Sequence, residues 1–104
     1  MECFEKRISK APLLADGAMG TYIYKKGVFV NKCYDELNLT QPELIKAIHE
    51  EYVDAGAQIV ETNTFGANRF RLEKHKLSDK REVINKSGVK LALEAADGKA
   101  YVAG

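Results

Sequence analysis

Three short apolar runs alternate with longer helical patterns along this sequence, and this order limits the possible folds more than any other property. The runs lie at residues 13–15, 59–60 and 100–103. Such alternation is typical of βα units, whose strands form a parallel sheet. The sequence therefore predicts an α/β fold with three parallel strands.

Two long helices are expected between these strands. Thr40 and Glu43 form a capping box at the start of the first helix, and Gly56 supplies its stop. Asp79 and Glu82 form a second capping box, and that helix runs to about Ala96. The apolar residues predicted to face the sheet are Leu44, Ile45, Ile48 and Tyr52 in the first helix, and Ile84, Gly88, Leu91, Ala92 and Ala95 in the second.

The region between the first run and the first long helix is less regular. A short helix is predicted from about Met19 to Lys26, closed by Gly27. Residues 28–39 mix aromatic and polar side chains without a period, so a loop is predicted there.

Length sets a second limit on the fold. The 104 residues suffice for one small domain, whereas a closed (β/α)8 barrel typically takes about 250. The last strand reaches Gly104 without a helix to cover it. We therefore expect the sequence to be cut from a longer one.

Charge and hydropathy exclude some classes of function. Sixteen basic and fifteen acidic residues leave a net charge of +1, which gives no general case for binding nucleic acid or membranes. No apolar stretch is long enough for a transmembrane helix or a secretory signal, so a cytoplasmic location is expected. One local exception is a basic patch, for which a solvated surface and an anionic partner such as RNA or a polyanionic cofactor are the two interpretations. Its residues are Arg69, Arg71, Lys74, Lys76, Lys80 and Arg81.

The cysteines and histidines give no metal motif. Cys3 and Cys33 lie thirty residues apart without a CxxC partner, so we interpret them as free thiols. His49 lies at the edge of an apolar helix face, where a hydrogen-bonded packing histidine is expected, and His75 is expected to be exposed.

Polar residues follow two of the predicted strands. Asp16 leads into the run Gly17-Ala18-Met19-Gly20-Thr21, in which small residues let backbone N–H groups approach an anion. Glu61 begins the second group, which continues through Thr62, Asn63, Thr64 and Phe65. Ligands of parallel α/β proteins bind at the carboxyl ends of strands. A carboxylate for an ammonium group and N–H donors for a carboxylate suit an amino-acid zwitterion.

A plainer interpretation of the first group stays open. Asp16 can cap the following helix, and Gly17 and Gly20 can serve the turn alone. Nucleotide phosphate binding is disfavoured, because the run has neither the lysine of a P-loop nor GxGxxG spacing.

The strings DGAMGT at residues 16–21 and ETNTFGAN at residues 61–68 closely resemble the homocysteine S-methyltransferase family, and the stretch at 36–43 fits as well. Residues 33–38 are most similar to the branch of that family joined to a methylenetetrahydrofolate reductase. The cobalamin-dependent methionine synthase branch is the near neighbour. The resemblance covers nearly all of residues 1–104, which we interpret as the N-terminal part of a homocysteine-binding domain.

The resemblance implies a (β/α)8 barrel, of which this chain holds about the first three βα units with parallel strands. It implies transfer of a methyl group to the sulfur of zinc-bound homocysteine, giving methionine, with methyltetrahydrofolate or methylcobalamin as possible donors. By similarity Asp16 holds the substrate ammonium, and the N–H groups of Gly17 and Ala18 meet its carboxylate. The remaining residues of the mouth are Glu61, Asn63, Thr64 and Phe65.

The family's three zinc cysteines, which include a Cys-Cys pair, have no match in this sequence. We therefore expect this chain to hold part of the amino-acid site and none of the metal site, and to be inactive alone. Its expected partners are homocysteine and the remainder of the barrel. The alternatives are a non-catalytic module that acts through a partner chain or through self-association at its sheet edges, and an anion- or RNA-binding protein that uses the basic patch.

Overall fold

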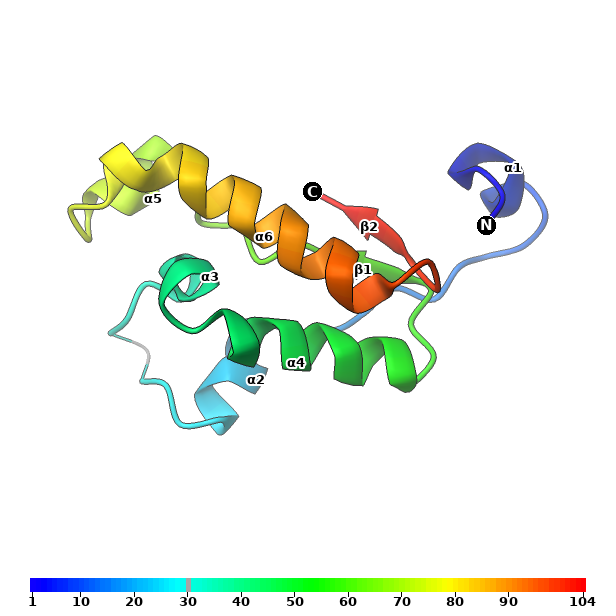
Figure 1. Cartoon of the computed structure of the whole chain (residues 1–104), viewed down its shortest axis with the longest axis horizontal. Helices are drawn as coiled ribbons and strands as arrows, with labels where there is room; N and C mark the ends of the chain where they lie inside the picture. The colour runs from blue at the N-terminus through cyan, green and yellow to red at the C-terminus, as the bar shows by residue number, and fades with distance from the viewer. Residues whose placement is uncertain (30) are drawn as a thin grey trace.

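The sheet is small and parallel. The computed structural model describes residues 1–29 and 31–104 and contains the strands β1 (Ile59–Glu61) and β2 (Tyr101–Ala103), paired with Ile59 opposite Tyr101. Both strands begin near the C-terminal ends of the long helices and run back along α6 (Figure 1). The second and third predicted strands are therefore confirmed.

The first predicted strand is reduced to one bridge. Ala15 pairs in parallel with Ile59, and the carbonyl oxygen of Leu14 accepts from the N–H groups of Gln58 and Ile59. The N–H group of Leu14 donates to the side-chain Oε1 of Gln58 at 2.9 Å, so a side chain replaces a ladder bond. Residues 13–15 are thus held beside β1 without forming a longer strand.

Two long helices lie side by side against the sheet (Figure 1). They are α4 (Pro42–Asp54) and α6 (Arg81–Ala96), as the periodicity predicts. Gly56 follows α4 with φ of 110°, a left-handed conformation that suits glycine. Every residue of the stripe predicted for α6 is buried.

Both predicted capping boxes are wrong. Thr40 is the last residue of the short helix α3 (Leu37–Thr40), and its hydroxyl lies 3.4 Å from the carbonyl oxygen of Glu36. Gln41 is the N-cap of α4, without a side-chain cap bond. The 3-10 helix η2 (Ser78–Lys80) runs directly into α6, so Asp79 lies inside a turn and caps nothing. In both places a preceding helical turn supplies the geometry that a cap would otherwise supply.

The segment predicted as a loop is partly helical. It contains the 3-10 helix η1 (Tyr34–Glu36) and most of α3, while its residue 30 lies outside the described residues. Leu37 and Asn38 are buried there, so tertiary packing decides a conformation that local periodicity does not. The predicted helix before it is confirmed as α2 (Gly20–Lys25), with Gly27 following at φ of 101°.

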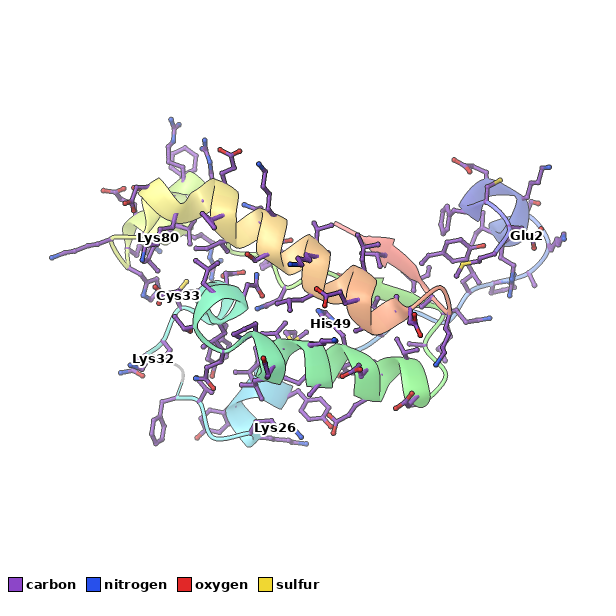
Figure 2. The ribbon with its side chains drawn as sticks, in the orientation of Figure 1. Glu2, Lys26, Lys32, Cys33, His49 and Lys80 are labelled. Carbon is purple, nitrogen blue, oxygen red and sulfur yellow. The ribbon has the colours of Figure 1, made fainter. Side chains whose placement is uncertain are left out.

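The largest core cluster lies between α2, α3, α4 and α6. Its buried members are Ile23, Leu37, Ile45, Ile48 and Leu91. His49 of α4 is fully buried as expected, but neither ring nitrogen has a hydrogen-bond partner within the described part of the chain, so the predicted hydrogen bond is wrong. Figure 2 shows His49 on α4, facing the region of α6.

Two short helices complete the fold. The helix α1 (Phe4–Ile8) lies at the end of the molecule where the strands begin (Figure 1), and the ring of Phe4 meets Tyr101 edge-on at 5.5 Å. The helix α5 (Arg69–Glu73) follows β1 and is capped by the Asn68 side chain, which accepts from the N–H group of Arg71 at 3.0 Å. No helix of the described residues is long and apolar enough to cross a membrane.

Candidate functional site

A cavity of about 280 Å³ opens where the paired segments end, at the carboxyl end of β1. We call it the Asp16 cavity. The two polar groups predicted from the sequence meet here, although they lie more than forty residues apart in the chain. Its lining residues are Asp16, Gly17, Ala18, Met19, Gly20, Glu61, Thr62, Asn63 and Phe65.

Asp16 is fixed to the end of β1 by two hydrogen bonds. Its backbone N–H donates to the carbonyl oxygen of Ile59 at 2.9 Å, and its carboxylate oxygen Oδ2 accepts from the N–H group of Glu61 at 3.1 Å. The carboxylate therefore does not cap the following helix, since α2 has Met19 at its N-cap without a side-chain bond. The part of the plainer interpretation that assigns Asp16 to a helix cap is therefore wrong.

Two carboxylates line this cavity, those of Asp16 and Glu61. Burial raises the pKa of the Asp16 carboxyl above its usual value, the hydrogen bond from the N–H group of Glu61 partly opposes this rise, and the nearby charge of Glu61 adds to it. No lysine, arginine or histidine of the described residues forms an ion pair with either carboxylate. A ligand with an ammonium group would relieve this repulsion.

The turn after Asp16 offers hydrogen-bond donors. Within the described residues the N–H groups of Gly17 and Ala18 have no acceptor. The Tyr52 hydroxyl of α4 donates to the carbonyl oxygen of Ala18 at 2.7 Å, which fixes the turn to the helix. A Cβ atom at Gly17 would lie 3.1 Å from that hydroxyl oxygen, so the close approach favours glycine.

Asn63 lines the cavity, but its side-chain amide forms hydrogen bonds to other parts of the protein. Its Nδ2 donates to the carbonyl oxygen of Tyr34 at 2.8 Å and to Oδ1 of Asn38 at 3.0 Å. The Asn38 amide donates in turn to the carbonyl oxygens of Asn63 at 2.8 Å and Ile84 at 3.2 Å. Asn63 therefore fixes the cavity wall to η1 and α3, and Asn38 links this wall to α6.

Thr64 packs against α6 and is not among the described residues that line the cavity. Its hydroxyl lies 2.6 Å from that of Thr62, and a Cβ atom added at Gly88 would lie 2.6 Å from its methyl carbon. Phe65 is 90 % exposed at the rim of the cavity. Of the residues predicted for the site, six line this cavity.

Sequence reasoning missed one functional contact. The periodicity predicts only that Tyr52 belongs to the apolar face of α4, yet its hydroxyl holds the turn that lines the cavity. The only sequence signal for this hydrogen bond is that the position holds a tyrosine, since leucine or isoleucine would fill the same apolar face without a hydroxyl.

The described residues do not fit a metal ion. No group of three or more histidine, cysteine, aspartate or glutamate side chains is close enough there to hold one. Cys3 is exposed near α1 and Cys33 is buried against Leu72 and Ile84, so the two thiols lie apart and free, as predicted.

The structure thus combines a parallel α/β fold with a polar cavity at the ends of its strands. The chain matches the homocysteine S-methyltransferase family over residues 13–104, and it belongs to that family.

Curated relatives and solved structures agree with this assignment. The methionine synthases of Mycobacterium tuberculosis and Mycobacterium leprae are each 33 % identical to this chain over 96 residues, which are 86 % of this chain and 8 % of theirs. The homocysteine methyltransferase MmuM of Escherichia coli in its oxidized form has a TM-score of 0.81 and 26 % identity, over 93 % of this chain and 38 % of that one. Its metallated form gives the same TM-score over 95 % and 39 %. The chain thus spans less than a tenth of the length of these methionine synthases.

Proposed function

We propose that this chain forms the amino-acid-binding part of a homocysteine S-methyltransferase, an enzyme that methylates the sulfur of homocysteine to give methionine. The observation that carries the proposal is the pairing of unbalanced carboxylates with free backbone N–H groups around one cavity. Family membership supplies the substrate, since the geometry alone fits amino-acid zwitterions in general.

In this proposal the substrate ammonium binds Asp16, with Glu61 adding negative charge. The substrate carboxylate accepts from the N–H groups of Gly17 and Ala18, which the hydroxyl of Tyr52 holds in place. Asn63 and Phe65 shape the wall and rim. The substrate side chain, with its sulfur, then extends out of the cavity.

We further propose that residues 1–104 are the N-terminal part of a homocysteine-binding domain built as a (β/α)8 barrel, with about three βα units in this chain. The parallel register of β1 and β2, the bridge at Ala15 and the likeness to MmuM support this. The open edge of β2 would pair with the next strand of the barrel.

Zinc is the cofactor that the family resemblance implies. Because the described residues do not fit a metal ion, we propose that its ligands lie outside this chain, in the remainder of the barrel. The 104 residues would then bind and orient the amino acid without catalysing methyl transfer.

The test begins with the native polypeptide that carries this sequence. An antibody raised against residues 1–104 captures it from source cells, and its intact mass is measured before methyl transfer to homocysteine is assayed with and without a zinc chelator. A product several hundred residues long with chelator-sensitive activity is expected. A native product near 11.6 kDa would contradict the proposal and favour a module that acts through a partner.

A further inference from the structure

A second cavity lies beside the first and has the opposite charge. It measures about 250 Å³ and lies between the loop before α3 and the segment around α5. Three cations line it, Lys32, Arg71 and Lys74, together with His75. Figure 2 shows Lys32 beside Cys33 near α3. We call this second cavity the cationic cavity.

These cationic groups make few interactions with the rest of the protein, although the charges of Arg71 and His75 oppose the rise in the pKa of Asp35 that burial causes. None of the four side chains forms an ion pair with the described residues, nor does any donate a side-chain hydrogen bond there. Asp35 is the one carboxylate that lines the cavity, and its Oδ1 accepts from the N–H group of Gly66 at 3.1 Å. Three lysine and arginine charges against one carboxylate leave an excess of positive charge in a concave site, where the potential is focused.

A glycine lets the charged groups come together. Gly66 is buried in the floor of the cavity, and a Cβ atom there would lie 2.6 Å from Oδ2 of Asp35 and 3.4 Å from Nε of Arg71. Any larger residue at 66 would therefore force the Asp35 carboxylate to shift. The guanidinium of Arg71 also lies 5.9 Å from the centre of the Phe65 ring, a contact that helps to hold it at the cavity.

The two cavities are neighbours, because Phe65 lines the Asp16 cavity and Gly66 lines the cationic cavity. At about 250 Å³ the second one is at the small end for a ligand site, so it suits one anionic group more than a whole large molecule.

We propose that the cationic cavity is a binding site for a phosphate or carboxylate group, in which Arg71 and Lys74 bind the oxyanion and Asp35 weakens its binding. Planar guanidinium groups favour such oxyanions because they donate two parallel hydrogen bonds. Nothing in this charge arrangement depends on which amino acid occupies the Asp16 cavity.

Calorimetric titration of inorganic pyrophosphate into the native polypeptide tests the site. Arg71→Gln and Lys74→Gln should each weaken binding about tenfold or more. The matched control is Lys80→Gln, because Lys80 is an exposed lysine of the same basic patch, at the start of α6, that does not line the cavity (Figure 2). Its affinity should stay unchanged. Circular dichroism checks that each variant is folded.

A change of the opposite sign gives a second test that misfolding cannot imitate. Asp35→Asn keeps an oxygen that can accept from Gly66 and removes the negative charge, so pyrophosphate should bind severalfold more tightly. Absence of binding to the wild type, or equal weakening by Arg71→Gln, Lys74→Gln and Lys80→Gln, would overturn the proposal.

The oxyanion has two possible sources, and kinetics separates them. If it is part of the methyl donor, Arg71→Gln should raise KM for a donor that carries phosphate or carboxylate groups and leave KM unchanged for a zwitterionic amino-acid donor. If it is a free anion, both KM values stay unchanged while pyrophosphate binding is lost. Asp16→Asn should leave pyrophosphate binding intact, so failure of the amino-acid site and failure of the cationic cavity are distinguishable.

Discussion

The carboxylate of Asp16 accepts a hydrogen bond from the backbone N–H of Glu61 at 3.1 Å, so the residue that begins one polar group is tied to the residue that begins the other. This bond joins the turn before α2 to the end of β1. It places two carboxylates at one cavity, and burial together with the charge of Glu61 raises the pKa of Asp16. The negative charge of these two carboxylates would therefore favour a cationic ligand in the cavity.

Asp16→Asn should weaken homocysteine binding by about 1.5–3 kcal/mol, because the charge-assisted bond to the substrate ammonium is lost. Calorimetric titration of the native polypeptide measures this, with metal content determined in parallel and expected to stay unchanged. Asp54→Asn, at the exposed end of α4, is the matched control. Unaltered binding in Asp16→Asn would remove this residue from the site.

The same binding should depend on pH. Because the pKa of Asp16 is raised, its carboxyl takes up a proton at a higher pH than an ordinary aspartate, and homocysteine affinity should fall as the pH drops through that raised value. In Asp16→Asn this fall should be much smaller. Affinity that follows pH identically in both proteins would count against ammonium binding at Asp16.

Tyr52→Phe should weaken homocysteine binding by about 0.5–1.5 kcal/mol, since the turn loses the hydrogen bond to the carbonyl oxygen of Ala18. The ring stays in place, so the unfolding midpoint should change little. Tyr24→Phe on α2 is exposed and far less constrained, and it should have no effect on affinity. Equal effects of the two changes would show that the Tyr52 hydroxyl does not position the site.

Gly88→Ala should lower the free energy of unfolding by roughly 1–3 kcal/mol, because the new methyl group would overlap the Thr64 methyl and the Asn38 amide. Denaturant unfolding measures the loss. Gly20→Ala is the control, because a Cβ there meets only ordinary contacts at 3.8 Å from Tyr34, and its effect should stay within about 0.5 kcal/mol. A Gly88→Ala protein as stable as wild type would mean that α6 can move away from the site.

His49 should make stability sensitive to acid. Burial lowers its pKa below the ordinary value of 6.5, so the unfolded chain binds the proton first. The stability that depends on neutral His49 is complete above pH 6.5 and is lost as the pH falls below it, by at most about 1.4 kcal/mol per pH unit.

The unfolding free energy of wild type minus that of His49→Leu should therefore decrease between pH 7 and pH 5. His75→Gln serves as the control variant, because it removes an exposed histidine instead of a buried one. A constant difference between wild type and His49→Leu would mean that His49 finds a partner when it is protonated.

Periodicity predicted the long helices and the last two strands because burial of one face is a strong, regular signal, as at Ile45, Ile48, Ile84 and Leu91. The two predicted capping boxes are wrong because a capping pattern uses only local sequence. Thr40 already belongs to the last turn of α3, so it cannot be the N-cap of α4. The sequence did not predict the short helix α3, because the burial of α3 depends on its contacts with α6, more than forty residues later in the chain.

The site was predicted in part for a related reason. Strand order implies that Asp16 and Glu61 lie at the same edge of the sheet, so their meeting follows from the fold class. The role of Tyr52 depends on the orientation of its hydroxyl, which donates to the carbonyl oxygen of Ala18. The orientation of the Asn63 amide depends on its hydrogen bond to Asn38. Neither orientation is encoded in spacing.

A crystal structure of the native polypeptide with homocysteine bound tests the central claim most directly. The substrate ammonium should lie within hydrogen-bond distance of the Asp16 carboxylate, with the substrate carboxylate against the N–H groups of Gly17 and Ala18. Homocysteine bound elsewhere, with the Asp16 cavity empty, would contradict the assignment of this chain as the amino-acid-binding part of the enzyme.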